Sequence, residues 1–314
     1  MARYVAKRLL WMIPITLGVA VLVFTLMTFC PGDPAEIILG STATEENLES
    51  LRQELGLNQP FLVRLGTFLS DTFLHFDLGN SWATGASVKA AIMERLPRTL
   101  TLATTMMAIS FCIGVPLGIM AAIHQNQWQD NLCMTLALIG ISIPNFWLAL
   151  LLVLLFSVKL GWLPAMGIQY YILPALAGCT GGIATSARQT RSSMLDVIRS
   201  DYITTARAKG VPEHQVIIKH ALKNGMIPII TVMGTHFGKM LGGTMIIETI
   251  FSIPGMGQLI INAVNGRDYQ VVQVGAVFLA IAFSFCMLAV DLLYAAVDPR
   301  IKAKYSSKGR KKVK

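Results

Sequence analysis

Charged side chains are scarce in this sequence. They make up 14% of its 314 residues, whereas hydrophobic residues make up 54%. Soluble domains carry charge on about a quarter of their residues, so the shortage indicates an integral membrane protein. The formal net charge of +9 does not predict nucleic-acid binding, because no basic surface interleaved with aromatic residues accompanies it.

Motifs for catalysis and metal binding are missing as well. The sequence has no HExxH, paired-carboxylate or GxSxG pattern, and Gly238-Lys239 lacks the further glycine and the Ser/Thr of a phosphate-binding loop. Its five cysteines show no CxxC or Cys/His spacing, which is typical of small buried apolar residues. We therefore expect no enzyme, no metal site and no cofactor in this chain.

Long apolar runs fill most of the sequence. Residues 9–30 carry no charge, and at about 1.5 Å per residue they can cross about 30 Å of hydrocarbon. No small-residue cleavage site follows, so we expect a retained span and not a signal peptide. An all-α membrane protein with six transmembrane helices is predicted, at about 9–30, 99–123, 132–158, 170–188, 227–249 and 271–297. The fourth span is the weakest, because it is rich in glycine and accompanied by Pro164 and Pro174.

The distribution of Lys and Arg predicts the orientation in the membrane. Three at the N-terminus, seven in residues 188–228 and eight after residue 299 make up 18 of the 26. Loops rich in Lys and Arg face the cytoplasm, so both termini and residues 188–228 are expected on that side. The domains predicted are an N-terminal segment with the first span (1–30), an extracytoplasmic helical segment (31–98), a five-span core (99–297) and a basic cytoplasmic tail (298–314).

The extracytoplasmic segment carries its own helix signals. A capping-box pattern from Thr42 to Glu45 predicts the start of a helix, and Gly56 predicts its end. We expect two or three amphipathic helices here.

A helix-turn-helix is predicted in the basic segment 188–228. The stretch Ala206-Arg207-Ala208-Lys209-Gly210 lets one helix end at the glycine, and a second helix can begin beyond Pro212. A short structure of this kind, projecting from the membrane, suits the docking of a partner.

This basic segment resembles the cytoplasmic "EAA" loop of bacterial ABC-importer permeases. Residues 205–210 read TARAKG and residues 220–224 read HALKN, which is similar to the dipeptide, oligopeptide and nickel branch of that family. The sequence departs from the general EAA pattern at Thr204, His220 and Lys223, where glutamate, isoleucine and proline are usual. Further matching motifs, which extend the resemblance over nearly the whole chain, are PGDP at 31–34, PNFW at 144–147, ETIFSIPGMG at 248–257, RDY at 267–269 and DPR at 298–300.

The resemblance implies a permease subunit in the bacterial cytoplasmic (inner) membrane. A second homologous permease would form a heterodimer with it, and two ABC ATPase subunits and an extracytoplasmic substrate-binding protein would complete the importer. Dipeptides or oligopeptides are the expected solutes, with nickel or a metal chelate as the alternative, since residues 144–167 look like the nickel members. A membrane-embedded enzyme or scaffold is the alternative from another class.

The loop and the fifth span hold the candidate functional residues. The ATPase-docking contact is expected at Thr204, Thr205, Ala206, Arg207, Ala208, Lys209 and Gly210, although Arg207 and Lys209 could instead be solvated charges that only set topology. Lys239 lies about 18 Å into the fifth span, with His236 one turn earlier on the same face. A charge at that depth is costly unless it faces protein or water, so both residues are candidates for the translocation path. Lys239 could equally extend along a subunit interface, and Asp291, nearer the cytoplasmic end of the sixth span, is expected to anchor a neighbouring helix or loop.

Overall fold

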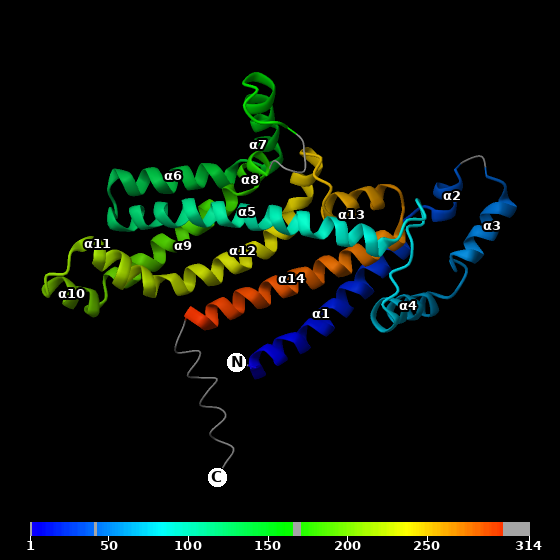
Figure 1. Cartoon of the computed structure of the whole chain (residues 1–314), viewed down its shortest axis with the longest axis horizontal. Coiled ribbons are helices and arrows are strands. Elements are labelled where there is room, and N and C mark those ends of the chain that lie inside the picture. Colours follow the sequence, from blue (N-terminus) through cyan, green and yellow to red (C-terminus); the bar gives the residue numbers. More distant parts are fainter. Residues whose placement is uncertain (1, 41–42, 166–170, 298–314) are drawn as a thin grey trace, which may run out of the picture. The chain divides into compact units, whose positions relative to one another are not determined.

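A computed structural model describes residues 2–40, 43–165 and 171–297 of the chain (Figure 1). The described residues are helical, with a single isolated β-bridge between Asn80 and Ser87. They form two compact units, each with its own core. Within the described residues, the first unit comprises residues 2–4, 100–253 and 285–297, and the second comprises residues 5–99 and 254–284.

The second unit contains most of the shorter N-terminal helices. Its elements, including a π-helical turn η1 and parts of three long helices, are α1 (Ala2–Phe29), α2 (Pro34–Leu39), α3 (Glu45–Glu54), α4 (Phe61–Ser70), η1 (Asp71–His75), the start of α5 (Val88–Ile123), α13 (Met256–Asn265) and most of α14 (Tyr269–Val297).

Local sequence explains the helix ends of this unit. The Asp33 side chain caps α2 by accepting a hydrogen bond from the N–H of Ala35 at 2.9 Å. Thr44 caps α3, which begins at Glu45, while Thr42 of the expected capping box lies outside the described residues. Gly56, with φ of +67°, follows the last turn of α3 as predicted.

Aromatic packing and a buried carboxylate hold the second unit together. The Phe24 ring of α1 stacks on Phe68 of α4 at 5.5 Å between centroids. Asp268, only 4% exposed, accepts hydrogen bonds from the hydroxyl of Ser81 at 2.5 Å and the N–H of Trp82 at 3.1 Å. These bonds tie the loop before α5 to the start of α14, because a buried carboxylate needs its acceptor sites filled.

The first unit is built mainly from long helices. Its elements are the remainder of α5, α6 (Trp128–Ser142), α7 (Asn145–Leu152), η2 (Val153–Lys159), α8 (Ile172–Gly178), α9 (Thr180–Ile198), α10 (Asp201–Ala208), α11 (Glu213–Gln215), η3 (Val216–Leu222), α12 (Lys223–Ile250) and the end of α14.

Helices α6, α9 and α12 lie side by side in this unit (Figure 1). Serine hydroxyls link neighbouring helices within the apolar core: Ser193 of α9 donates to the carbonyl of Gly225 in α12 at 2.7 Å. Ser110 of α5 donates to the carbonyl of Cys179 at 3.0 Å. Such bonds add to van der Waals packing, which is the main force between helices in lipid.

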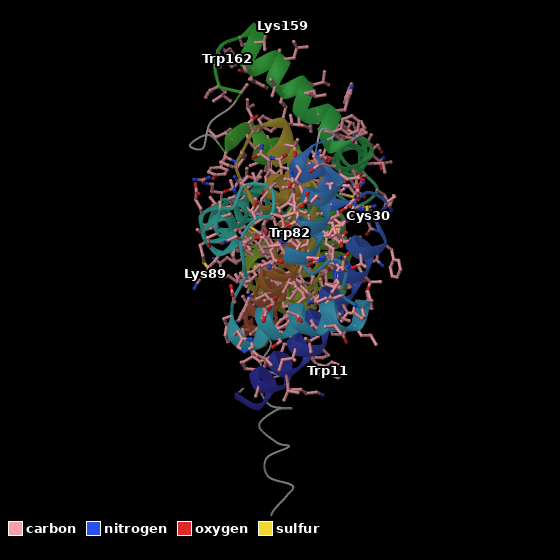
Figure 2. All side chains as sticks on the ribbon, turned by 90° about the vertical axis from the view of Figure 1, so that its right-hand side faces the viewer. Trp11, Cys30, Trp82, Lys89, Lys159 and Trp162 are labelled. Carbon is pink, nitrogen blue, oxygen red and sulfur yellow. The ribbon has the colours of Figure 1, made fainter. Side chains whose placement is uncertain are left out.

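The predicted third span is not one continuous helix. Helices α6 and α7–η2 are bent by 95° at Ile143 and Pro144. Proline disfavours helical backbone in the residue before it and lacks the N–H that the helix would need, which explains the break. The α7–η2 segment projects from the long helices, and Figure 2 shows Lys159 and Trp162 at its far end.

The predicted count of six spans is only partly reproduced. Among the described residues, four helices are long and apolar enough to cross a membrane: Val5–Phe29, Val88–Ile123, Glu213–Ile250 and Tyr269–Leu292. The bent pair makes a fifth if it is one span. The predicted fourth span corresponds to α8 and α9, which fall outside this set. The Gly, Thr, Ser and Arg residues of α9 lower its apolar character.

Candidate functional site

The predicted helix-turn-helix is present at residues 201–215. Helix α10 starts after Ser200, whose backbone is extended, and ends at Ala208, with Lys209 as its C-cap. Gly210 then adopts a φ of +76°, in the left-handed region that favours glycine. The N–H of Val211 donates to the carbonyl of Ala206 at 3.3 Å, so the turn closes on the helix it ends. Helix α11 follows directly after Pro212.

One isoleucine anchors α10 to the rest of the unit. Ile203 is completely buried, in a cluster with Ala122, Met194, Val216, Ile217 and Ala221. Ala206, three residues later on the same face, is half-buried against this cluster. The sequence analysis did not single out Ile203, although an isoleucine within the polar stretch DYITTARAKG is a signal for such an anchor.

The residues expected to dock a partner lie mostly on the opposite, exposed surface. Thr204, Thr205, Arg207, Ala208, Lys209 and Gly210 are exposed, and only Ala206 turns towards the cluster. On this surface, the tyrosine hydroxyl of Tyr202 accepts a hydrogen bond from the side-chain amide of Asn224 in α12 at 2.9 Å. Ile203 and Tyr202 thus hold α10 in place, while the helix presents a polar face.

Arg207 is not simply a solvated charge. Its guanidinium binds both carboxylate oxygens of Glu213 across the turn, at 2.6 and 3.1 Å. These hydrogen bonds raise the pKa of Arg207. The pair is largely exposed, so its contribution to stability is small and its main effect is to fix the geometry of the turn. Lys209 makes no ion pair with any residue that the structure describes.

Helix α12 presents a second feature, an exposed polar face that we call the α12 stripe. Lys239 lies in it, and the residues that share the exposed face at helical spacing are Pro228, Thr231, Thr235, Gly242, Ile246 and Thr249. His236 is only half-buried, and its Nδ1 has no hydrogen-bond partner among the described residues. The structure therefore separates the two candidates: Lys239 points outward, whereas His236 lies near Gly181 of α9.

Two family models match the chain. The model described as binding-protein-dependent transport system inner membrane component matches residues 114–303, and the model of the N-terminal part of this component matches residues 1–103. Together they span almost the whole sequence.

Curated relatives align over nearly their full length. A putative peptide transport system permease protein of Brucella abortus (strain 2308) is 44% identical over 313 residues, covering 96% of this chain and 99% of that protein. The glutathione transport system permease protein GsiC of Salmonella paratyphi A is 45% identical over 307 residues, covering 97% of this chain and all of that protein.

Solved structures show the same fold. The inward-facing MetNI methionine ABC transporter contains a chain that is similar with a TM-score of 0.59, at 20% identity, over 67% of this chain and 97% of the matched chain. With the family models and the relatives, this likeness confirms the resemblance seen in the sequence. The chain belongs to the binding-protein-dependent transport system inner membrane component family, and it is a multi-pass inner membrane permease of the ABC-importer type.

Proposed function

We propose that this permease carries peptides. The observation that supports this solute is the full-length similarity, at 44–45% identity, to permeases named for peptide and glutathione transport. Glutathione is itself a tripeptide, so both names describe one chemical class. The nickel alternative is correspondingly less favoured.

We propose that α10 docks an ATPase subunit. Its exposed face, residues 204–210 without Ala206, is polar, and its buried face is fixed by Ile203. Along the chain, α9 directly precedes α10, and α11, η3 and α12 follow it. A displacement of α10 on closure of the ATPases would therefore pass directly into two long helices as a rigid-body movement.

We propose that the α12 stripe faces the solute path, which a second homologous permease completes. Gly242 and Gly243 support this arrangement, because a Cβ on either would meet no atom within 4 Å. Each glycine costs a helix about 1 kcal/mol relative to alanine, and packing among the described residues does not require it. We attribute both glycines to a close approach by the second permease. Lys239 would also be poorly placed against lipid.

The proposed topology follows from the basic residues. Both termini and α10 lie in the cytoplasm, and residues 31–98 lie outside, where a substrate-binding protein would dock. With the bent pair α6 to η2 and the pair α8–α9 each crossing once, the six expected crossings are reached.

Co-purification and uptake test the proposal. The chain, co-expressed with the second permease, the ATPases and the binding protein of its own importer, should be isolated as a complex whose ATP hydrolysis is stimulated by loaded binding protein. Cells with the complex should accumulate labelled dipeptide and not labelled nickel. Isolation of the chain alone, or nickel accumulation without peptide uptake, would contradict the proposal.

A further inference from the structure

A basic cavity lies between α6 and α9, away from both the exposed face of α10 and the α12 stripe. Its volume is about 610 Å³, within the range of small-molecule sites. Three arginines line the cavity. Arg188 and Arg191 lie in α9, and Arg199 directly follows it. Met134, Leu138 and Leu195 supply its apolar wall.

The arginines differ in how far their charge is already neutralised. Arg191 donates to both oxygens of Asp130 at 2.6 Å, and Asp130 is only 2% exposed. The Asp130 carboxylate therefore already neutralises the charge of the partly exposed Arg191. Among the described residues, the Arg199 side chain donates only to the neutral side chain of Gln125, at 3.1 Å.

Arg188 is exposed and has no hydrogen-bond or ion-pair partner within the described part of the chain. Asp196 also lines the cavity and is likewise without a basic partner there. Two unneutralised arginines against one carboxylate leave the cavity with an excess of one positive charge, so it favours an anion.

An apolar lane leads away from this basic cavity along α6. Met134, Leu138 and Ile141 follow one another at spacings of four and three residues, which places them on one helix face. Leu138 is 58% exposed and Ile141 is 42% exposed. Trp128, at the start of α6, is 69% exposed. Exposed tryptophans at the ends of apolar helices are typical of the membrane–water boundary, so we place the boundary near this residue. The lane therefore starts near that boundary and runs into the hydrocarbon.

We propose that the cavity binds the phosphate headgroup of an anionic phospholipid, with an acyl chain along the apolar lane of α6. Arginine suits this ligand, because its planar guanidinium donates two hydrogen bonds to phosphate oxygens. Basic pockets between transmembrane helices are suited to such headgroups. An acidic protein surface could satisfy Arg188 and Arg199 but would not use the exposed lane beside them.

The proposal needs only that the chain spans a membrane, and it is independent of the solute and of ATPase docking. The cavity lies on the stretch of α9 that leads into α10. A bound lipid would therefore hold α6 against α9 and raise the thermal stability of this unit.

Lipid binding to the purified, delipidated complex tests the proposal. Native mass spectrometry and thermal unfolding in detergent would compare dioleoyl phosphatidylglycerol with dioleoyl phosphatidylethanolamine, which has the same acyl chains and no net charge. Inorganic phosphate forms a third arm, which separates the headgroup from the free anion. Phosphatidylglycerol should bind at least tenfold more tightly than phosphatidylethanolamine and should raise the Tm.

Removal of the two arginines should abolish this preference. Each basic residue near an anionic membrane surface is worth about fivefold in affinity, so Arg188→Gln with Arg199→Gln should weaken phosphatidylglycerol binding about 30-fold. Lys219→Gln is the matched control, because Lys219 is an exposed basic residue of η3 outside the cavity. Both variants change exposed side chains, and the Tm without lipid shows that each is folded.

Three results would overturn the proposal: equal binding of the two lipids, an equal loss of binding in the Lys219→Gln control, or inorganic phosphate that stabilises the complex as strongly as phosphatidylglycerol. Peptide uptake should be measured on the same variants. This measurement distinguishes a failure of the lipid proposal from a failure of the proposed transport function.

Discussion

Replacement of Ile203 by alanine should detach α10 without preventing membrane insertion. The helix has eight residues, a length at which an isolated helix is hardly populated in water. Its stability therefore depends on the completely buried Ile203 side chain and on the cluster around it. The other side-chain contacts of α10, through Ala206, the Tyr202 hydroxyl and the Arg207–Glu213 pair, are half-buried or exposed.

The expected magnitude follows from this burial. Isoleucine-to-alanine substitutions in cores cost about 2 to 5 kcal/mol, and a site near the surface that can relax belongs at the lower end. A loss of about 2 to 3 kcal/mol corresponds to a 30- to 160-fold increase in the open population of α10. The long helices do not depend on this side chain, so the protein should still insert.

Hydrogen exchange followed by mass spectrometry measures the open population directly. In the purified complex, peptides covering residues 201–208 should exchange 30- to 160-fold faster in Ile203→Ala, whereas peptides from α12 should be unchanged. Peptide-stimulated ATP hydrolysis should fall in parallel. Ile203→Val, which removes one methylene and costs about 0.5 to 1.5 kcal/mol, should give an intermediate result.

Ile218 provides the matched control. It is the same residue type in the same basic segment, but it is 59% exposed, so Ile218→Ala should alter neither measurement. Unchanged exchange in Ile203→Ala would refute the claim that packing of Ile203 holds α10. Faster exchange with fully retained stimulation of ATP hydrolysis would refute α10 as the coupling contact.

Three further perturbations have defined outcomes. Gly210→Pro should abolish coupled uptake, because proline cannot adopt the φ of +76° and loses the N–H donated to the carbonyl of Arg207. Gly210→Ala, whose Cβ would meet no atom within 4 Å, should cost only about 1 to 2 kcal/mol and retain part of the uptake; equal uptake by the two variants would contradict this reasoning. Lys239→Met should impair peptide uptake with insertion and ATPase binding intact, since a charge about 6 Å from a carboxylate at an effective dielectric near 20 contributes roughly 2 to 3 kcal/mol; unchanged uptake of labelled peptide would remove Lys239 from the path. Asp130→Ala should lower stability by about 3 kcal/mol, the lower end of the range for a broken buried pair, because Arg191 keeps 27% of its side chain exposed. Asp130→Ala with Arg191→Met should recover most of that loss; thermal unfolding in which the double variant is no better than the single one would argue against a stabilising ion pair.

The helix ends of the proposed coupling segment were predictable because local chemistry controls them. Gly210 and Pro212 act through their own backbone preferences, which need no tertiary contact. The all-helical class followed in the same way from the shortage of charge and the length of the apolar runs. Gly56 was recognised as the end of α3 for the same reason.

Continuity of a span was not predictable from apolar content alone. Residues 132–158 are uncharged throughout, yet the helix breaks at Pro144 and turns by 95°. A proline in a membrane helix can be accommodated where neighbouring groups bind the freed carbonyls, and only the packing around it shows whether that happens. The polar composition of α9 likewise becomes understandable from its neighbours, since Ser193 and Arg191 find their partners on α12 and α6.

The sequence by itself determined the membrane location, the helical class, the family and the position of the α10 turn, because hydrophobicity, charge and backbone preference are properties of short stretches of chain. Only the tertiary structure decided which face of each helix is buried. It placed Ile203 inside and Thr204 outside, separated the exposed Lys239 from the half-buried His236, and paired Asp130 with Arg191 across 61 positions of sequence. The physical reason is that burial and pairing depend on distant residues meeting in space, and no local pattern contains that information.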